Sequence, residues 1–139
     1  MNTLEVVDTI RQKFAVTGNP TKIPLLKGDV FTAELEWDGI RVDNLGNQPF
    51  LPWAVFQEVI CVLIRNDGVA DRGNAMGPRL GDPDLSFDSI EGHVANVVYG
   101  KKSGDAIFRR VTPIACILIW AGICEEAPGQ LILRNKKPA

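Results

Sequence analysis

Residues 108–133 decide the fold, and their sequence is FRRVTPIACILIWAGICEEAPGQLIL. Thr112 is a good helix N-cap because its hydroxyl can accept a hydrogen bond from a free amide of the first turn. Pro113 suits the first helical position, where a missing N–H costs nothing, and Gly122 suits the left-handed position just after a helix. We therefore predict a helix over residues 113–121. It carries no polar side chain on any face, so it should be buried all round.

Two short strands, at 123–125 and 131–134, are predicted around the Ala-Pro-Gly turn that follows this helix. A buried helix, a glycine and a small hairpin form the closing half of a winged-helix domain. The residues resemble that superfamily, most closely the last helix and wing of the winged-helix module at the N-terminus of Mrr-type restriction proteins. The resemblance is carried by Phe108, Arg110-Val111, Ala115, Leu118, Ala121-Gly122-Ile123 and Leu131-Ile132-Leu133.

This resemblance implies a winged-helix fold and, as an expectation, nucleic-acid binding. A DNA-reading helix normally has a polar face, which 113–121 lacks. Contact with nucleic acid is therefore expected from the entrance of the helix or from the wing.

Length and composition fit one ordinary globular domain. The chain has 139 residues, of which 45% are hydrophobic and 23% charged. Its net charge is −2 and its pI about 5.4, which argues against a dedicated non-specific nucleic-acid binder but leaves room for a local basic patch.

No apolar run is long enough to span a membrane, and the first residues lack the pattern of a signal peptide. Cys61, Cys116 and Cys124 are odd in number and form no Cys-x-x-Cys pair, so we interpret them as buried hydrophobic residues in a reducing compartment. We expect a cytoplasmic protein with no metal site, no cofactor and no membrane partner.

The N-terminal part is predicted to be a helix followed by a hairpin. Leu4, Val7, Ile10 and Phe14 recur at helical spacing over residues 3–15, and Asn2 and Glu5 stand at capping-box positions. Residues 16–28 are predicted to be a loop. Strands at 31–37 and 40–43 then flank an Asp38-Gly39 turn, a register that pairs Trp37 with Ile40, Glu36 with Arg41, and Leu35 with Val42.

The apolar face of this hairpin needs a cover. We favour burial within the chain, and the alternative is a dimer interface, which Phe50, Leu51 and Trp53 could extend. The residues of this face are Phe31, Leu35, Trp37, Ile40 and Val42.

The remaining pattern completes an α+β fold. Helices are predicted at 53–66 and 89–99, separated by a long Gly- and Pro-rich loop at 67–87. Together with 113–121 and its hairpin they give a winged-helix-like three-helix unit with a C-terminal β-hairpin wing. We expect this domain over 49–135, with 1–48 as an N-terminal extension of one helix and one hairpin.

A basic set marks the turn before the last helix. In a helix-turn-helix protein this turn faces the DNA backbone, so we predict phosphate contacts here, against the alternative of a merely solvated turn. The predicted nucleic-acid-binding residues are Lys101, Lys102, Arg109 and Arg110, joined from the long loop by Arg72 and Arg79.

No catalytic constellation is evident, so we predict that the chain is not an enzyme. The glycine-rich loop at 68–81 lacks the Gly-Lys-Ser/Thr ending of a phosphate-binding P-loop. Pro83-Asp84 could begin a nuclease metal site, but no Asp-x-Lys or Glu-x-Lys follows. The acids of this region are better explained as turn formers and caps, and a lone histidine is usually structural. An enzyme would have to use Asp82, Asp84, Glu91 and His93.

Two function classes remain open on the sequence. One is a winged-helix protein, regulatory or associated with restriction, that binds duplex DNA through the basic turn and the wing. The other is a winged-helix derivative that serves as a protein-interaction or dimerisation module, favoured by the acidic pI and the apolar last helix.

Overall fold

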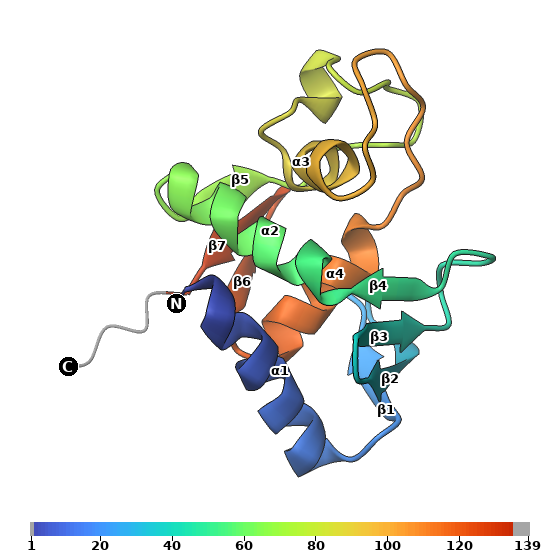
Figure 1. The fold of residues 1–139 in the computed structure, drawn as a ribbon, viewed down its shortest axis with the longest axis vertical. Helices are drawn as coiled ribbons and strands as arrows, with labels where there is room; N and C mark the ends of the chain where they lie inside the picture. Colours follow the sequence, from blue (N-terminus) through green and yellow to red (C-terminus); the bar gives the residue numbers. More distant parts are fainter. Residues whose placement is uncertain (1, 135–139) are drawn as a thin grey trace.

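The computed structural model describes residues 2–134 and has a mixed α+β architecture, as the sequence predicts (Figure 1). Its described part contains two antiparallel sheets, with strand orders β1-β2-β3-β4 and β5-β7-β6. In chain order the elements are α1 (Thr3–Thr17), β1 (Thr21–Pro24), β2 (Val30–Glu36), β3 (Gly39–Val42), β4 (Phe50–Pro52), α2 (Trp53–Arg65), β5 (Val69–Asp71), the 3-10 helix η1 (Pro83–Leu85), α3 (Ile90–Val97), α4 (Val111–Trp120), β6 (Cys124–Ala127) and β7 (Gln130–Leu133).

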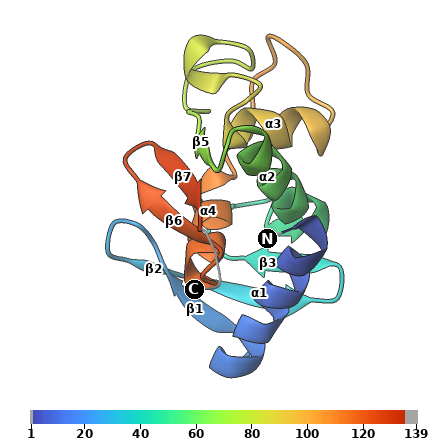
Figure 2. The ribbon, with the colours of Figure 1, turned by 90° about the vertical axis from the view of Figure 1, so that its left-hand side faces the viewer.

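The helices α2 and α4 lie at the centre of the molecule. Helix α1 packs along α2, and the first sheet lies beside α1, while α3 and the loops around it form the opposite end (Figures 1 and 2). The second sheet lies against α2 and α4.

The predicted first helix is confirmed as α1. The Asn2 side chain accepts from the amides of Leu4 and Glu5, and the Glu5 side chain accepts from the Asn2 amide, which is the predicted capping box. The buried face consists of Val6, Ile10 and Phe14, and Leu4 points outward. The buried face of α1 is therefore rotated slightly from the predicted one, with Val6 buried in place of Leu4.

The hairpin is confirmed, but its predicted register is wrong. Leu35 pairs with Ile40 and Glu36 with Gly39, so Trp37 and Asp38 form the turn. The predicted register takes no account of β4, which pairs with β3 from Gly39 to Arg41. A Cβ on Gly39 would overlap the carbonyl oxygen of Leu51, so only glycine allows this approach. Because the register moves by two residues, each side chain keeps its predicted face.

Most of the apolar face of this hairpin is covered by the chain itself. Phe31, Ile40 and Val42 are at most 3% exposed, and Leu35 packs against the same cluster. Trp37 differs, being 85% exposed at the turn. A dimer interface built on this face would have only Trp37 freely available. Strand β1 covers the other edge of β2 and was predicted as loop.

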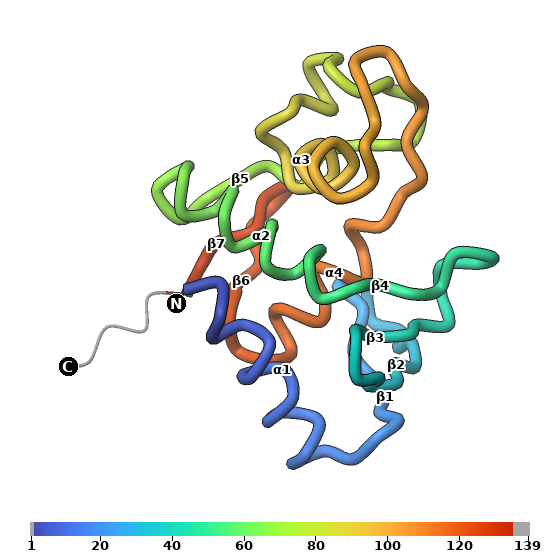
Figure 3. The backbone as a smooth tube through the Cα atoms, in the orientation of Figure 1, coloured from blue at the N-terminus to red at the C-terminus, as the bar shows by residue number. Residues whose placement is uncertain are grey.

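The long loop after α2 is more ordered than predicted. The predicted 53–66 helix is confirmed as α2, but Val69–Asp71 then form β5, which pairs with β7 in register Ala70 with Leu131. The rest of the loop is held by a small apolar cluster of its own, made of Leu80, Leu85, Ala95 and Ile107. The trace in Figure 3 shows this loop beside the segment after α3, and backbone hydrogen bonds join Leu80 to Gly104 and Asp105.

The last helix is buried as predicted but begins two residues early. Helix α4 starts at Val111 with Arg110 as N-cap, so Thr112 lies inside the first turn and does not cap it. The cap comes from Glu91, whose carboxylate accepts from the amides of Arg110 and Val111 at 3.0–3.1 Å. The distant side chain of Glu91 thus caps α4 in place of the predicted Thr112.

The main apolar cluster of the described residues runs from Val6 in α1 to Leu131 in β7 and leaves out only the small cluster around Leu80 and Leu85. The predicted boundary between 1–48 and 49–135 runs through it, and residue 135 lies outside the described residues.

Candidate functional site

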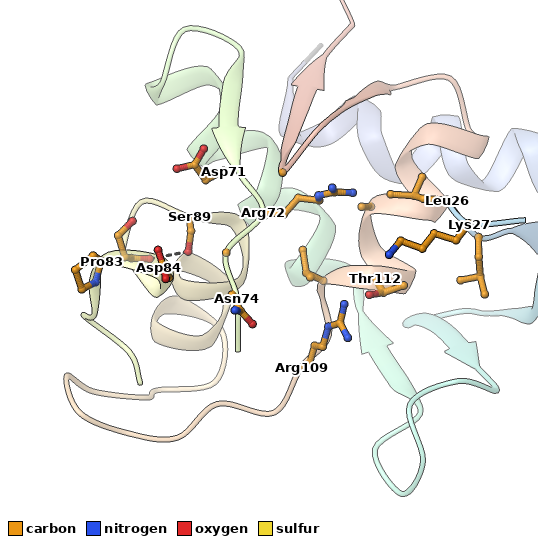
Figure 4. A pocket seen from close by; sticks show the side chains of 16 residues that line it. Leu26, Lys27, Asp71, Arg72, Asn74, Pro83, Asp84, Ser89, Arg109 and Thr112 are labelled. Atoms are coloured by element: carbon orange, nitrogen blue, oxygen red, sulfur yellow. Dashed lines mark hydrogen bonds between the residues drawn. The ribbon is translucent and has the colours of Figure 1, made fainter. Parts of the chain in front are cut away.

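A cleft of about 700 Å³ lies at the entrance of α4 (Figure 4). Its walls come from the β1–β2 loop at 25–27, from 71–74 after β5, from 83–89 around η1, and from 109–115. Gly129 in the β6–β7 turn completes it. We call this the α4-entrance cleft.

Backbone hydrogen bonds fix the middle of the cleft. The Arg72 amide donates to the carbonyl of Gly129, and the Arg72 carbonyl accepts from the Glu91 amide, both at 2.9 Å. Gly73 follows with φ +85°, and a Cβ there would stand 2.7 Å from Ser89 Oγ. Segment 72–74 is therefore held between the β6–β7 turn and the start of α3.

Three cations line the cleft without a carboxylate partner. Within residues 2–134, no Asp or Glu oxygen lies within 4.0 Å of the charged groups of Lys27, Arg72 or Arg109. Arg109 makes one contact, from Nη1 to Met76 Sδ at 3.3 Å. Figure 4 shows the three side chains around Thr112, whose side chain also faces the cleft. Such an arrangement can hold an anionic group of a ligand.

Two carboxylates line the other side. In Figure 4 Asp84 lies beside Pro83 and Ser89, and Asp71 lies at the end of β5, both away from the cations. Both are exposed, and Asp71 accepts only a 3.3 Å hydrogen bond from Gln130. No group of three or more His, Cys, Asp or Glu side chains in the described chain could hold a metal ion. The cleft is thus polarised, with positive charge at α4 and negative charge near η1.

The predicted basic set does not stay together. Arg72 and Arg109 line the cleft, whereas Lys101 and Lys102 lie exposed in the segment after α3. Arg79 donates to the carbonyl of Gly104 at 3.4 Å and so joins the two loops. Lys27 is the residue that sequence reasoning missed, because a single lysine in a loop carries no pattern.

Arg110 is not a surface contact, contrary to expectation. Its side chain is 6% exposed, and its guanidinium carbon lies 3.7 Å from the ring centroid of Tyr99 and 4.8 Å from that of Phe108. Nη2 donates to Gln48 Oε1. A guanidinium can be buried here because two aromatic faces and the nearby Glu91 carboxylate compensate its charge. Arg110 therefore stabilises the start of α4.

Three of the four residues considered for catalysis, Asp82, Glu91 and His93, have structural partners. Asp82 accepts from the Arg79 amide at 2.7 Å, a turn-forming contact, and Glu91 caps α4. Burial raises the pKa of Glu91, opposed by the amides of Arg110 and Val111 and by the charge of Arg110. His93 Nε2 lies 2.9 Å from Glu58 Oε1, and His93 is 6% exposed. Of these residues only Asp84 faces the cleft.

The chain matches no protein-family model, no curated protein and no solved structure. None of the helices described between residues 2 and 134 has the length and apolar character needed to cross a membrane.

Proposed function

We propose that this chain is a winged-helix-like protein, without catalytic activity, that binds the sugar–phosphate backbone of nucleic acid at the α4-entrance cleft. The observation that carries the proposal is the convergence of Lys27, Arg72 and Arg109 on one cleft, without carboxylate partners in the described chain.

The order of elements supports a winged-helix assignment. From α2 onward the chain runs helix, strand, helix, helix, strand, strand, and β5 pairs with the last strand. This is the order typical of winged-helix domains, with β6 and β7 as the wing. The turn of the wing contributes Gly129 to the cleft, so helix entrance and wing meet at the same place.

The same arrangement favours backbone contact over base readout by α4. Residues Pro113 to Leu118 of α4 are all buried, so that helix cannot enter a major groove as it stands. Arginine and lysine heads at its entrance can bind phosphates, an interaction that orients nucleic acid without reading its sequence. Affinity should then fall with salt, by about 0.9 log units per log unit of salt for each phosphate contacted.

The test compares two variants that lose the same charge. Full-length Arg72→Ala/Arg109→Ala and Lys101→Ala/Lys102→Ala are titrated against random duplex DNA by fluorescence anisotropy at several salt concentrations. We expect the cleft variant to bind at least about tenfold more weakly with a shallower salt slope, and the lysine variant to change little.

Circular dichroism checks that each variant is folded. Arg109→Ala alone changes an exposed side chain, so its loss of DNA affinity can be measured with little risk to the fold. Absence of wild-type binding at low salt would refute the proposal. Equal losses in the two double variants would mean that binding follows overall charge and is not localised in the cleft, and a larger loss in the lysine variant would place the contact on the loop that carries Lys101 and Lys102.

A protein-interaction module is the second candidate, and Trp37 is the observation that favours it. Its side chain is 85% exposed at the hairpin turn. Exposed tryptophans are enriched where proteins bind proteins. Light scattering of wild type and Trp37→Ala would reveal self-association through this residue.

A further inference from the structure

We infer that the α4-entrance cleft holds one nucleotide bearing a terminal phosphate monoester, with the phosphate at the cations and the base toward the carboxylates. The inference rests on the proposed function and names the part of a nucleic acid that the cleft takes.

The first argument is shape. Separate segments of the chain line an open cleft of about 700 Å³, within the range of about 300–1,000 Å³ usual for pockets that take a small ligand. A continuous duplex backbone can contact the cations at the mouth of this cleft but is too wide to fill it. The end of a strand can enter, because its last nucleotide is the cheapest to unstack.

The second argument is the charge at α4. A phosphate monoester carries about −1.5 to −2 charges at pH 7 and three terminal oxygens. An internal phosphodiester carries one charge and two free oxygens. Lys27, Arg72 and Arg109, with the Thr112 hydroxyl beside them, offer more donors than a diester can use. Two N-terminal amides of α4 are already taken by Glu91, so side chains supply this half of the site.

The third argument is the opposite wall. Asp71 and Asp84 would repel a ligand that is anionic throughout, but carboxylates accept hydrogen bonds from base amino and imino groups. A nucleotide is anionic at one end and carries N–H donors at the other, which matches the polarity of the cleft.

The test uses the wild-type full chain and labelled single strands of one sequence, measured by anisotropy. The strands end in a 5′-phosphate, in a 3′-phosphate or in hydroxyls, and one is circularised. We expect one phosphate-ended strand to bind at least about tenfold more tightly than the hydroxyl-ended and circular strands. Arg72→Ala/Arg109→Ala should remove that preference.

Nucleoside monophosphates added as competitors identify the source of the nucleotide. Weak competition assigns the site to a strand end, and competition at the concentration of the strand itself assigns it to a free nucleotide; both support the inference. Equal affinity for circular and phosphate-ended strands, still lost in the arginine variant, would overturn it and leave the proposed function standing. No binding of any strand or duplex would overturn both.

The acidic wall has its own variant. Asp71→Asn/Asp84→Asn should change the preference among terminal bases, tested with strands that differ only in the last nucleotide, and keep the preference for a phosphate. Asp8→Asn/Asp38→Asn removes the same charge at exposed positions outside the cleft and serves as control. Uniformly tighter binding of every strand by the cleft variant would mean that the carboxylates only repel phosphate, and would overturn base recognition.

Discussion

Arg109 and Arg110 are neighbours in the sequence, but their surroundings differ completely. Arg109 is exposed and lines the α4-entrance cleft. Arg110 is 6% exposed, lies between the rings of Tyr99 and Phe108, and supports the start of α4. A dipeptide of two arginines predicts a basic patch, whereas only one of the two is available to a ligand.

Cys124 gives a residue-scale prediction about pH. Its side chain is 2% exposed, and burial raises the pKa of the thiol from 9.0 to about 12. In the unfolded chain the thiol ionises near its usual pKa, so rising pH stabilises the unfolded state before it affects the folded one. Stability from this group is therefore complete below about pH 9 and is lost as pH rises toward 12.

We expect the free energy of unfolding of wild type, relative to that of Cys124→Ala, to fall by about 1.4 kcal/mol per pH unit above pH 9. Urea unfolding at a series of pH values between about 8 and 10.5 measures this difference. Cys61→Ala is the control, because Cys61 is less buried and its pKa is raised less by burial. Parallel pH profiles of wild type and Cys124→Ala would contradict the expectation.

At the scale of elements, local patterns located the helices and long-range contacts set their ends. Capping by Asn2 at α1 is visible in the sequence and is present, whereas α3 begins one residue later than predicted and is capped by Ser89, which accepts from the Gly92 amide. The start of α4 is different, since Thr112 and Pro113 form a good local start that the protein does not use. Glu91, far away in the sequence, accepts from the amides of Arg110 and Val111. The helix therefore begins at Val111, two residues before the predicted start.

We expect Glu91→Gln to lower the free energy of unfolding by about 1–3 kcal/mol. Oε1 of Glu91 accepts from both amides and Oε2 accepts from that of Arg110, so the glutamine side chain would turn its NH2 donor toward the Arg110 N–H and lose the negative charge. Urea unfolding followed by circular dichroism measures the change. Asp88→Asn is the matched control, because it removes an exposed ion pair with Arg65, worth about 0–1 kcal/mol. Equal losses in the free energy of unfolding would show that the Glu91 cap stabilises the protein no more than an exposed ion pair does.

The whole molecule is organised around one apolar cluster. Val6 and Phe14 of α1 belong to it, together with Ile60 of α2 and Ile117 of α4. The edge of the Trp120 ring meets Phe14, with ring centroids 5.0 Å apart. A fragment that begins at residue 49 would therefore lose the part of the core that α1 and the first sheet supply.

We expect the full chain to unfold in one transition, with the same midpoint by circular dichroism and by tryptophan fluorescence. A fragment from residue 49 to the end should show no cooperative transition, because α2 would expose the face that packs on α1. Two separate transitions in the full chain, or cooperative unfolding of the fragment, would mean that the N-terminal elements are an independent extension.

The sequence by itself determined the α+β class, the existence of the four α-helices, both hairpins and the burial of the middle of α4, from Pro113 to Leu118. These features follow from hydrophobic periodicity, caps and turn residues, which act between residues close together in the chain. The sequence did not reveal β1, β4 or β5, because three or four residues carry little pattern until a partner strand pairs with them.

Only the tertiary structure decided the hairpin register, the cap of α4 and the membership of the candidate site. The register follows from the approach of β4 to Gly39, and the cleft joins Lys27, Arg72 and Arg109 from three distant segments. Such contacts depend on which surfaces meet when the core closes. A charge in the sequence gains its role only when that packing leaves it free, as with Arg109, or encloses it, as with Arg110.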